Sequence, residues 1–157
     1  MGYKNNNLFS SLNLLKLSFA LLIVGFTLPI GCKSNGFQIF TGILGKGAKK
    51  INFGLIEDIY GYMLLGVFIL AVVGLILTFL PEIKFSLVLS YICLALGLLL
   101  IVTILYKFNF YFKFKDFSFH NKYWPAKIEF LPGFYIILAG YVVGTISFLM
   151  KVILKKD

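Results

Sequence analysis

Residues that could carry out acid–base or metal chemistry are few in this chain, and their spacing does not group them. The sequence holds one histidine, His120, and two cysteines, Cys32 and Cys93. Zinc sites usually combine several Cys and His ligands at short spacing, and His120 has no such neighbour. A nucleophilic cysteine needs a base beside it, and His120 is the only imidazole that Cys32 could use. We therefore predict no catalytic residue, no metal site and no cofactor, and a protein that is not an enzyme.

The carboxylates also avoid the apolar parts of the sequence. Ion-coupled carriers and proton relays normally place acids or histidines within the membrane. The six acidic residues lie instead in loops, in tails or beside the apolar stretches; they are Glu57, Asp58, Glu82, Asp116, Glu129 and Asp157. This distribution argues against a transporter.

A glycine-rich segment, Gly42–Gly47, has the composition of a phosphate-binding loop but not its pattern. A P-loop requires glycine where Phe40 stands and serine or threonine where Gly47 stands. The segment therefore predicts no nucleotide site. Its basic residues and those that follow have two interpretations, a solvated turn, which is the one we prefer, or contact with lipid phosphates; they are Lys46, Lys49 and Lys50.

The net charge is +9, and all 15 basic residues are lysine. Arginine is the preferred residue for bidentate recognition of phosphates and base edges, so its absence argues against nucleic-acid binding. Lysines near a membrane surface attract anionic head groups. We therefore expect membrane lipids among the partners and no nucleic acid.

Three stretches lack charged residues for about the 20 residues that a membrane-spanning helix needs: Ile59–Leu80, Phe85–Tyr106 and Leu131–Met150. A helix rises about 1.5 Å per residue, so each could cross a hydrocarbon core of about 30 Å. Hydrophobic residues make up 60% of the chain, more than a soluble domain of this length could bury. The sequence therefore predicts an integral membrane protein.

The first apolar segment, Leu12–Gly31, has two interpretations. It can be a retained fourth span, which is the interpretation we prefer. It can also be a signal peptide that ends in a lipoprotein box, in which Gly31 precedes an acylated Cys32. Pro29 stands where such a box usually has leucine.

With a retained first helix, the predicted fold is an all-α membrane protein, a four-transmembrane-helix bundle that forms one domain over residues 1–157. The spans are about 12–31, 59–80, 85–106 and 131–150, and the two long outer loops are 32–58 and 107–130. Lysines are dense in the short tail from Lys151 to Lys156. This density favours cytoplasmic termini under the positive-inside rule.

Residues 107–115, at the start of loop 107–130, alternate phenylalanine with polar or amphipathic residues. This period of two is typical of a strand and predicts the first strand of a hairpin. A second alternating run, Ala126–Phe130, follows Trp124 and would complete a hairpin. Gly36–Gly42 in loop 32–58 would add a third strand, giving a small extracytoplasmic antiparallel β-sheet from loops 1 and 3. The alternative is that these aromatic residues lie in the membrane interface. The phenylalanines of one strand face are Phe108, Phe110, Phe112 and Phe114.

Small residues at helical spacing mark close helix contacts within membranes. Gly140 and Gly144 form a GxxxG pattern in the last span, and Gly66 and Gly74 lie eight residues apart in the second. We predict that these four glycines pack helices within the bundle.

Two short stretches carry a resemblance to known proteins: Leu28–Cys32 with Gly36, Phe40–Gly42 and Gly47, and later Glu129–Tyr135. The chain resembles uncharacterised small bacterial four-span membrane proteins in these motifs. The resemblance implies a fold and no activity. We expect the protein to lie in the bacterial inner (cytoplasmic) membrane. The topology is similar to that of claudins, by analogy only, because their paired loop cysteines are missing here.

The leading expectation is therefore a non-enzymatic membrane scaffold or accessory subunit with a membrane-protein partner. The alternatives are a protein that binds or handles a lipid or other small molecule, and a lipoprotein acylated at Cys32. The residues expected to contact the partner or lipid are Lys46, Lys49, Lys50, Phe108, Phe110, Phe112, Phe114 and Trp124.

Overall fold

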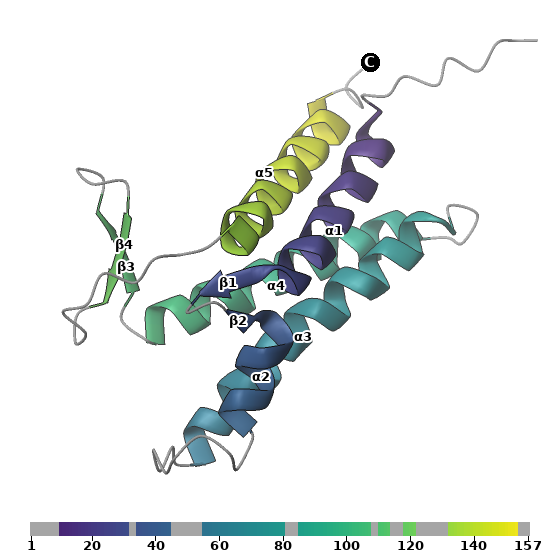
Figure 1. Ribbon diagram of the computed structural model, residues 1–157. Coiled ribbons are helices and arrows are strands. Elements are labelled where there is room, and N and C mark those ends of the chain that lie inside the picture. The colour runs from purple at the N-terminus through teal and green to yellow at the C-terminus, as the bar shows by residue number, and fades with distance from the viewer. Residues whose placement is uncertain are drawn as a thin grey trace, which may run out of the picture.

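The computed structural model describes residues 10–31, 34–44, 55–80, 85–107, 110–113, 118–121 and 132–153. The described residues form five helices and four short strands (Figure 1). In order they are α1 (Ser11–Thr27), β1 (Pro29–Gly31), β2 (Ser34–Asn35), α2 (Gly36–Leu44), α3 (Leu55–Thr78), α4 (Ser86–Lys107), β3 (Phe110–Lys113), β4 (Ser118–Asn121) and α5 (Pro132–Ile153).

Three of these helices, α3, α4 and α5, are long and apolar enough to cross a membrane. α4 and α5 have 22 residues each, which corresponds to about 33 Å at about 1.5 Å per residue. α1 is apolar but shorter, with 17 residues. These lengths and compositions are those of a membrane protein.

The first helix ends earlier than predicted, at Thr27 instead of Gly31. Pro29 explains the difference, because proline disfavours helical geometry in the residue before it. Leu28 accordingly has the extended angles φ −84° and ψ 160°. At the other end, the Ser10 side chain caps α1 by accepting a hydrogen bond from the Asn13 N–H at 3.2 Å.

The predicted strand Gly36–Gly42 is wrong, because this segment belongs to helix α2. A reciprocal pair of hydrogen bonds starts the helix. The Gln38 N–H donates to Asn35 Oδ1 at 2.8 Å, and the Asn35 N–H donates to Gln38 Oε1 at 3.0 Å. This is a capping box, which satisfies two backbone donors that a helix start otherwise leaves open.

The long helices pack antiparallel and define two faces of the bundle. α1 and α4 begin, and α3 and α5 end, at what we call the turn face; the opposite end is the loop face. α1 lies against α5 along its length and also contacts α3, and α3 pairs with α4 (Figure 1). α4 and α5 make few contacts with each other. α1 is therefore the central helix, and its fully buried apolar residues include Leu15 and Phe19.

Small residues form the seam between α1 and α5 at intervals of seven positions. Ser147 Oγ donates to the Ser11 carbonyl at 2.6 Å, and Ser18 Oγ donates to the Gly140 carbonyl at 2.8 Å. Seven positions after Ser18, a Cβ on Gly25 would lie 2.8 Å from the carbonyl oxygen of Gly133. The two backbones can approach this closely because no large side chain separates them.

The four glycines predicted to pack helices have different surroundings. A Cβ on Gly74 would overlap the ring of Phe19, and one on Gly144 would lie 2.6 Å from Ser18 Oγ. A Cβ on Gly140 would lie 3.0 Å from the Leu22 side chain and 3.1 Å from the Ser18 carbonyl oxygen. Gly66 meets only the end of the Leu100 side chain, at 3.3 Å, so it has the most space of the four.

The strands form two separate antiparallel ladders. β1 pairs with β2, and β3 pairs with β4 in the register Phe110–Asn121, Tyr111–His120, Phe112–Phe119 and Lys113–Ser118. Within the described residues, no ladder joins the two loops, so the predicted common sheet is not present there. The segment predicted to pair with the first strand, 126–130, lies outside the described residues.

Candidate functional site

The residues predicted to contact a partner or lipid lie mostly outside the described part of the chain. Phe110 and Phe112 belong to β3, where their backbones pair with Asn121 and Phe119. Cys93 is a buried free thiol on α4. The predicted contact and lipidation residues outside the described ranges are Lys46, Lys49, Lys50, Phe108, Phe114, Trp124 and Cys32.

Hydroxyl groups within the described helices mainly bind backbone carbonyls. Ser90 Oγ donates to the carbonyl of Ser86 at 2.9 Å and lies 3.3 Å from that of Gly74, which connects α4 to α3. Thr103 Oγ1 donates to the Leu99 carbonyl at 2.8 Å within α4. These hydroxyls therefore stabilise helices and helix pairs.

Among the described residues, no group of three or more Cys, His, Asp or Glu side chains is placed to hold a metal ion.

Three aromatic rings join α1, α2 and α3, at the C-terminal end of α1 and beside the middle of α3. The ring centroids of Phe37 and Phe68 lie 4.8 Å apart, and Phe26 lies 5.0 Å from each of them. Such edge-to-face and tilted pairs contribute about 0.5–1.5 kcal/mol each beyond their buried area. Gly36 lets α2 approach, because a Cβ there would lie 2.6 Å from the Phe26 ring. α2 is thus fixed to the bundle by its first turn.

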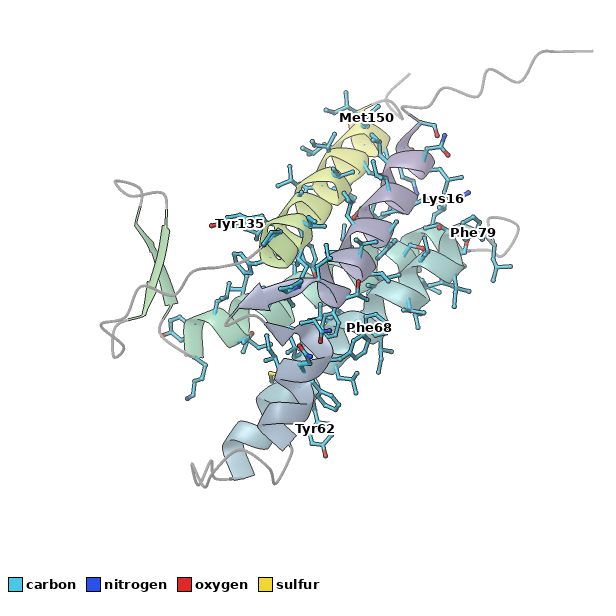
Figure 2. The ribbon with its side chains drawn as sticks, viewed as in Figure 1. Lys16, Tyr62, Phe68, Phe79, Tyr135 and Met150 are labelled. Atoms are coloured by element: carbon cyan, nitrogen blue, oxygen red, sulfur yellow. The ribbon has the colours of Figure 1, made fainter. Side chains whose placement is uncertain are left out.

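Phe37 also belongs to a more exposed group of rings on α2 and α3. We call this group the aromatic edge; it consists of Phe37, Phe40 and Tyr62. The rings of Phe40 and Tyr62 lie 6.4 Å apart. Tyr62 is 62% exposed, and its side chain points away from the bundle (Figure 2). This surface is not among the predicted sites, because Phe37 and Phe40 lie in the segment predicted to be a strand. Their spacing of three residues after a capping box would have placed them on one side of a helix.

A groove lies between α4 and α5, where these two helices make few contacts. Its volume is about 200 Å³, and its walls are mainly apolar. The lining residues are Tyr91, Leu94, Ala95, Leu98, Tyr141, Thr145 and Phe148. No pattern in the sequence indicates this groove, since it depends on how two helices from different parts of the chain diverge.

At the turn face, the groove ends at a hydrogen-bonded chain and a lysine. Tyr91 Oη lies 2.9 Å from Ser147 Oγ. Because the Ser147 hydroxyl gives its proton to the Ser11 carbonyl, Tyr91 is the donor in this bond. Lys151 Nζ lies 5.1 Å from the centroid of the Tyr91 ring, a cation–π contact. A positive charge is therefore held beside the end of an apolar groove.

Deeper in the bundle, Tyr141 closes the groove. Its hydroxyl lies over α4 at Gly97, since a Cβ on Gly97 would be 2.7 Å from it. Thr145 Oγ1 donates to the Tyr141 carbonyl at 2.9 Å within α5. Tyr141 is buried, so the ring forms a wall between the groove and the core.

No family model, curated protein or solved structure matches this chain. The resemblance to small bacterial four-span proteins therefore stays a prediction.

Proposed function

We propose that this protein is a non-enzymatic integral membrane scaffold or accessory subunit that contacts a second membrane protein near its loop face. The aromatic edge is the observation that supports this proposal most directly. In the proposed setting, the bacterial inner membrane, the termini are cytoplasmic and the loop face is extracytoplasmic. In this function, the chain holds Phe37, Phe40 and Tyr62 of the aromatic edge in place and does no chemistry on a substrate.

The aromatic edge has the properties of a protein contact surface. Tyrosine and other large aromatic residues dominate binding energy at protein interfaces. Binding is stronger when the contact residues are already ordered, because less conformational entropy is lost. Here the Phe26–Phe37–Phe68 cluster fixes α2, and with it Phe37 and Phe40, before any partner arrives.

The outer loops complete the proposed contact surface. The β3–β4 ladder follows α4 at the loop face, and the predicted contact residues Phe108, Phe114 and Trp124 come from the same loop. Lys46, Lys49 and Lys50 follow α2 in sequence, where they would contact the partner or anionic lipid.

The test is recovery of a partner from native membranes. The tagged full-length protein is extracted in mild detergent, and the species that co-purify are identified and quantified by mass spectrometry. We expect a membrane-protein partner at near-stoichiometric yield. The double variant Phe40→Ala with Tyr62→Ala should lower that yield at least ten-fold.

The matched control is Phe79→Ala with Phe85→Ala, which removes two aromatic residues that are 62% and 73% exposed but lie at the turn face, away from the aromatic edge and the outer loops. This control should keep the wild-type yield. Equal loss from both double variants, or a wild-type chain without any protein partner, would refute the proposed function. Deleting residues 107–130 tests the loop contribution in the same assay.

The groove between α4 and α5 favours a second candidate function, the binding of a lipid. Its location differs from the aromatic edge, so the two candidates involve different residues. One chain can serve both.

A further inference from the structure

We propose that the groove between α4 and α5 binds one acyl chain of an anionic phospholipid, whose head group is held by Lys151. This inference deepens the lipid-binding candidate and is independent of the scaffold function. It rests on the position, size, lining and charge of the groove.

The position of the groove exposes it to lipid tails. Both of its helices are long and apolar enough to span a membrane, and Ala95, Leu98 and Phe148 on its rim are exposed. In a bilayer, the medium beside these residues is hydrocarbon. An apolar cavity of about 150 Å³ can hold a benzene molecule, so a groove of about 200 Å³ accepts a segment of an acyl chain.

The depth of the groove matches one leaflet. On α5, Tyr141 closes the deep end and Lys151 stands at the shallow end. The two residues are ten positions apart, which corresponds to about 15 Å of helix, half of a hydrocarbon core of about 30 Å. A chain lying in the groove therefore belongs to a lipid whose head group is at the turn face.

The charge at the shallow end selects an anionic head group. Lys151 Nζ lies over the Tyr91 ring, which also lines the groove. A lipid phosphate at this level would be attracted to the ammonium group, and its tail would run along Leu94 and Leu98. The sequence adds Lys155 and Lys156 in the following tail. A second copy of the chain is a less suitable occupant, because a helix with its side chains is about 10–12 Å wide and would not enter a groove of this volume.

A comparable lysine without a groove provides the control. Lys16 Nζ lies 4.4 Å from the centroid of the Phe79 ring, also near the turn face (Figure 2). The groove described above does not include these residues. Lys16 and Lys151 therefore share charge and aromatic contact, and they differ in the adjoining apolar space.

The test uses purified, delipidated full-length protein titrated with dioleoyl phosphatidylglycerol or dioleoyl phosphatidylcholine and examined by native mass spectrometry. We expect one phosphatidylglycerol to bind tightly. Lys151→Gln should weaken its binding about five-fold, as expected for loss of one lysine near a lipid head group, and should leave phosphatidylcholine unchanged. Lys16→Gln should have no effect on either lipid.

A second pair of variants tests the acyl chain site. Ala95→Phe places a ring in the groove and should abolish the tight binding, whereas Ala139→Phe makes the same exchange at an exposed position of α5 outside the groove. Equal lipid binding by Lys151→Gln and Lys16→Gln, or by Ala95→Phe and Ala139→Phe, would overturn the proposal. Dimers that Ala95→Phe dissociates would also overturn it, since a second copy would then occupy the groove. Partner recovery should be unchanged in all four variants, which separates this result from the scaffold test.

Discussion

The ring of Phe19 on α1 lies directly against the backbone of Gly74 on α3, in the space that a Cβ on Gly74 would need. Phe19 is fully buried. A large aromatic residue can pack this deeply only because α3 presents no side chain at that level. The contact between the central helix and α3 therefore depends on the smallest residue of one helix and a large residue of the other.

Gly74→Ala should destabilise the protein by about 1–3 kcal/mol, the usual effect of overpacking a core. Gly66→Ala is the control on the same helix, because the added methyl would meet only the flexible end of Leu100. We expect it to change stability by less than about 0.5 kcal/mol. Thermal unfolding in detergent measures both, and equal effects would contradict the proposed role of Gly74.

Removing the Phe19 ring should cancel the effect of the added methyl. Phe19→Ala alone should cost about 3–5 kcal/mol because it leaves a large cavity. In that background, Gly74→Ala should be close to neutral, since the overlapping ring is gone. A double-mutant cycle from the same unfolding measurements gives this coupling, and additive effects would show that the two residues act separately.

Ser147→Ala should destabilise the protein more than Tyr91→Phe. Ser147 links α4, α5 and α1, because it accepts from Tyr91 and donates to the Ser11 carbonyl. Ser147→Ala leaves the Tyr91 hydroxyl and the Ser11 carbonyl without this partner, which should lower the free energy of unfolding by about 1–2 kcal/mol. Tyr91→Phe removes one hydrogen bond and should lower it by about 0.5–1 kcal/mol. Unfolding of the two variants and the double variant tests the order, and a larger effect of Tyr91→Phe would reverse the assignment.

Asn35→Ala should loosen α2 without unfolding the bundle. The substitution removes the acceptor for the Gln38 N–H, a change that costs about 1 kcal/mol at a helix N-cap. Hydrogen exchange should become faster in α2 and stay unchanged in α5. Asn35→Asp keeps an acceptor at the same position and should keep the wild-type exchange rate; fast exchange in this variant would refute the capping role.

Peptides from α1 should be present in the purified protein, without an acyl modification on Cys32. Cleavage before Cys32 would remove Leu15 and Phe19 from the core and uncover Gly74. Peptide mapping and intact mass provide the measurement, with Cys32→Ser as the control for lipidation. A mature chain that starts at an acylated Cys32 would establish the lipoprotein alternative.

The three long spans could be predicted from the sequence because uninterrupted apolar length is a direct requirement of the bilayer. Local rules that were visible in the sequence account for two errors. Pro29 ends α1 early, and the Asn35–Gln38 capping box makes a helix where alternating residues suggested a strand. In these places a local hydrogen bond or steric clash overrides periodicity.

The arrangement of the helices was harder to predict than their existence. Gly140 and Gly144 were recognised as packing residues, but the partner helix was not identified. Ser11, Ser18 and Gly25 recur at seven-residue intervals, as do Gly133, Gly140 and Ser147, and this shared spacing is a signal that could have matched the two helices. The groove and the aromatic edge depend on tertiary packing, which no single stretch of sequence encodes.

The hydrogen bond from Ser18 to Gly140 joins residues 122 positions apart, and this separation constrains biosynthesis. The ribosome delivers α1 to the membrane long before α5 exists, so the serine and glycine side of α1 initially faces lipid or a chaperone. Contacts between distant segments form late, and incompletely assembled chains expose surfaces that attract wrong partners. α5 therefore completes the environment of α1, and a nascent chain that stops before α5 exposes its central helix to the proteases and chaperones of quality control.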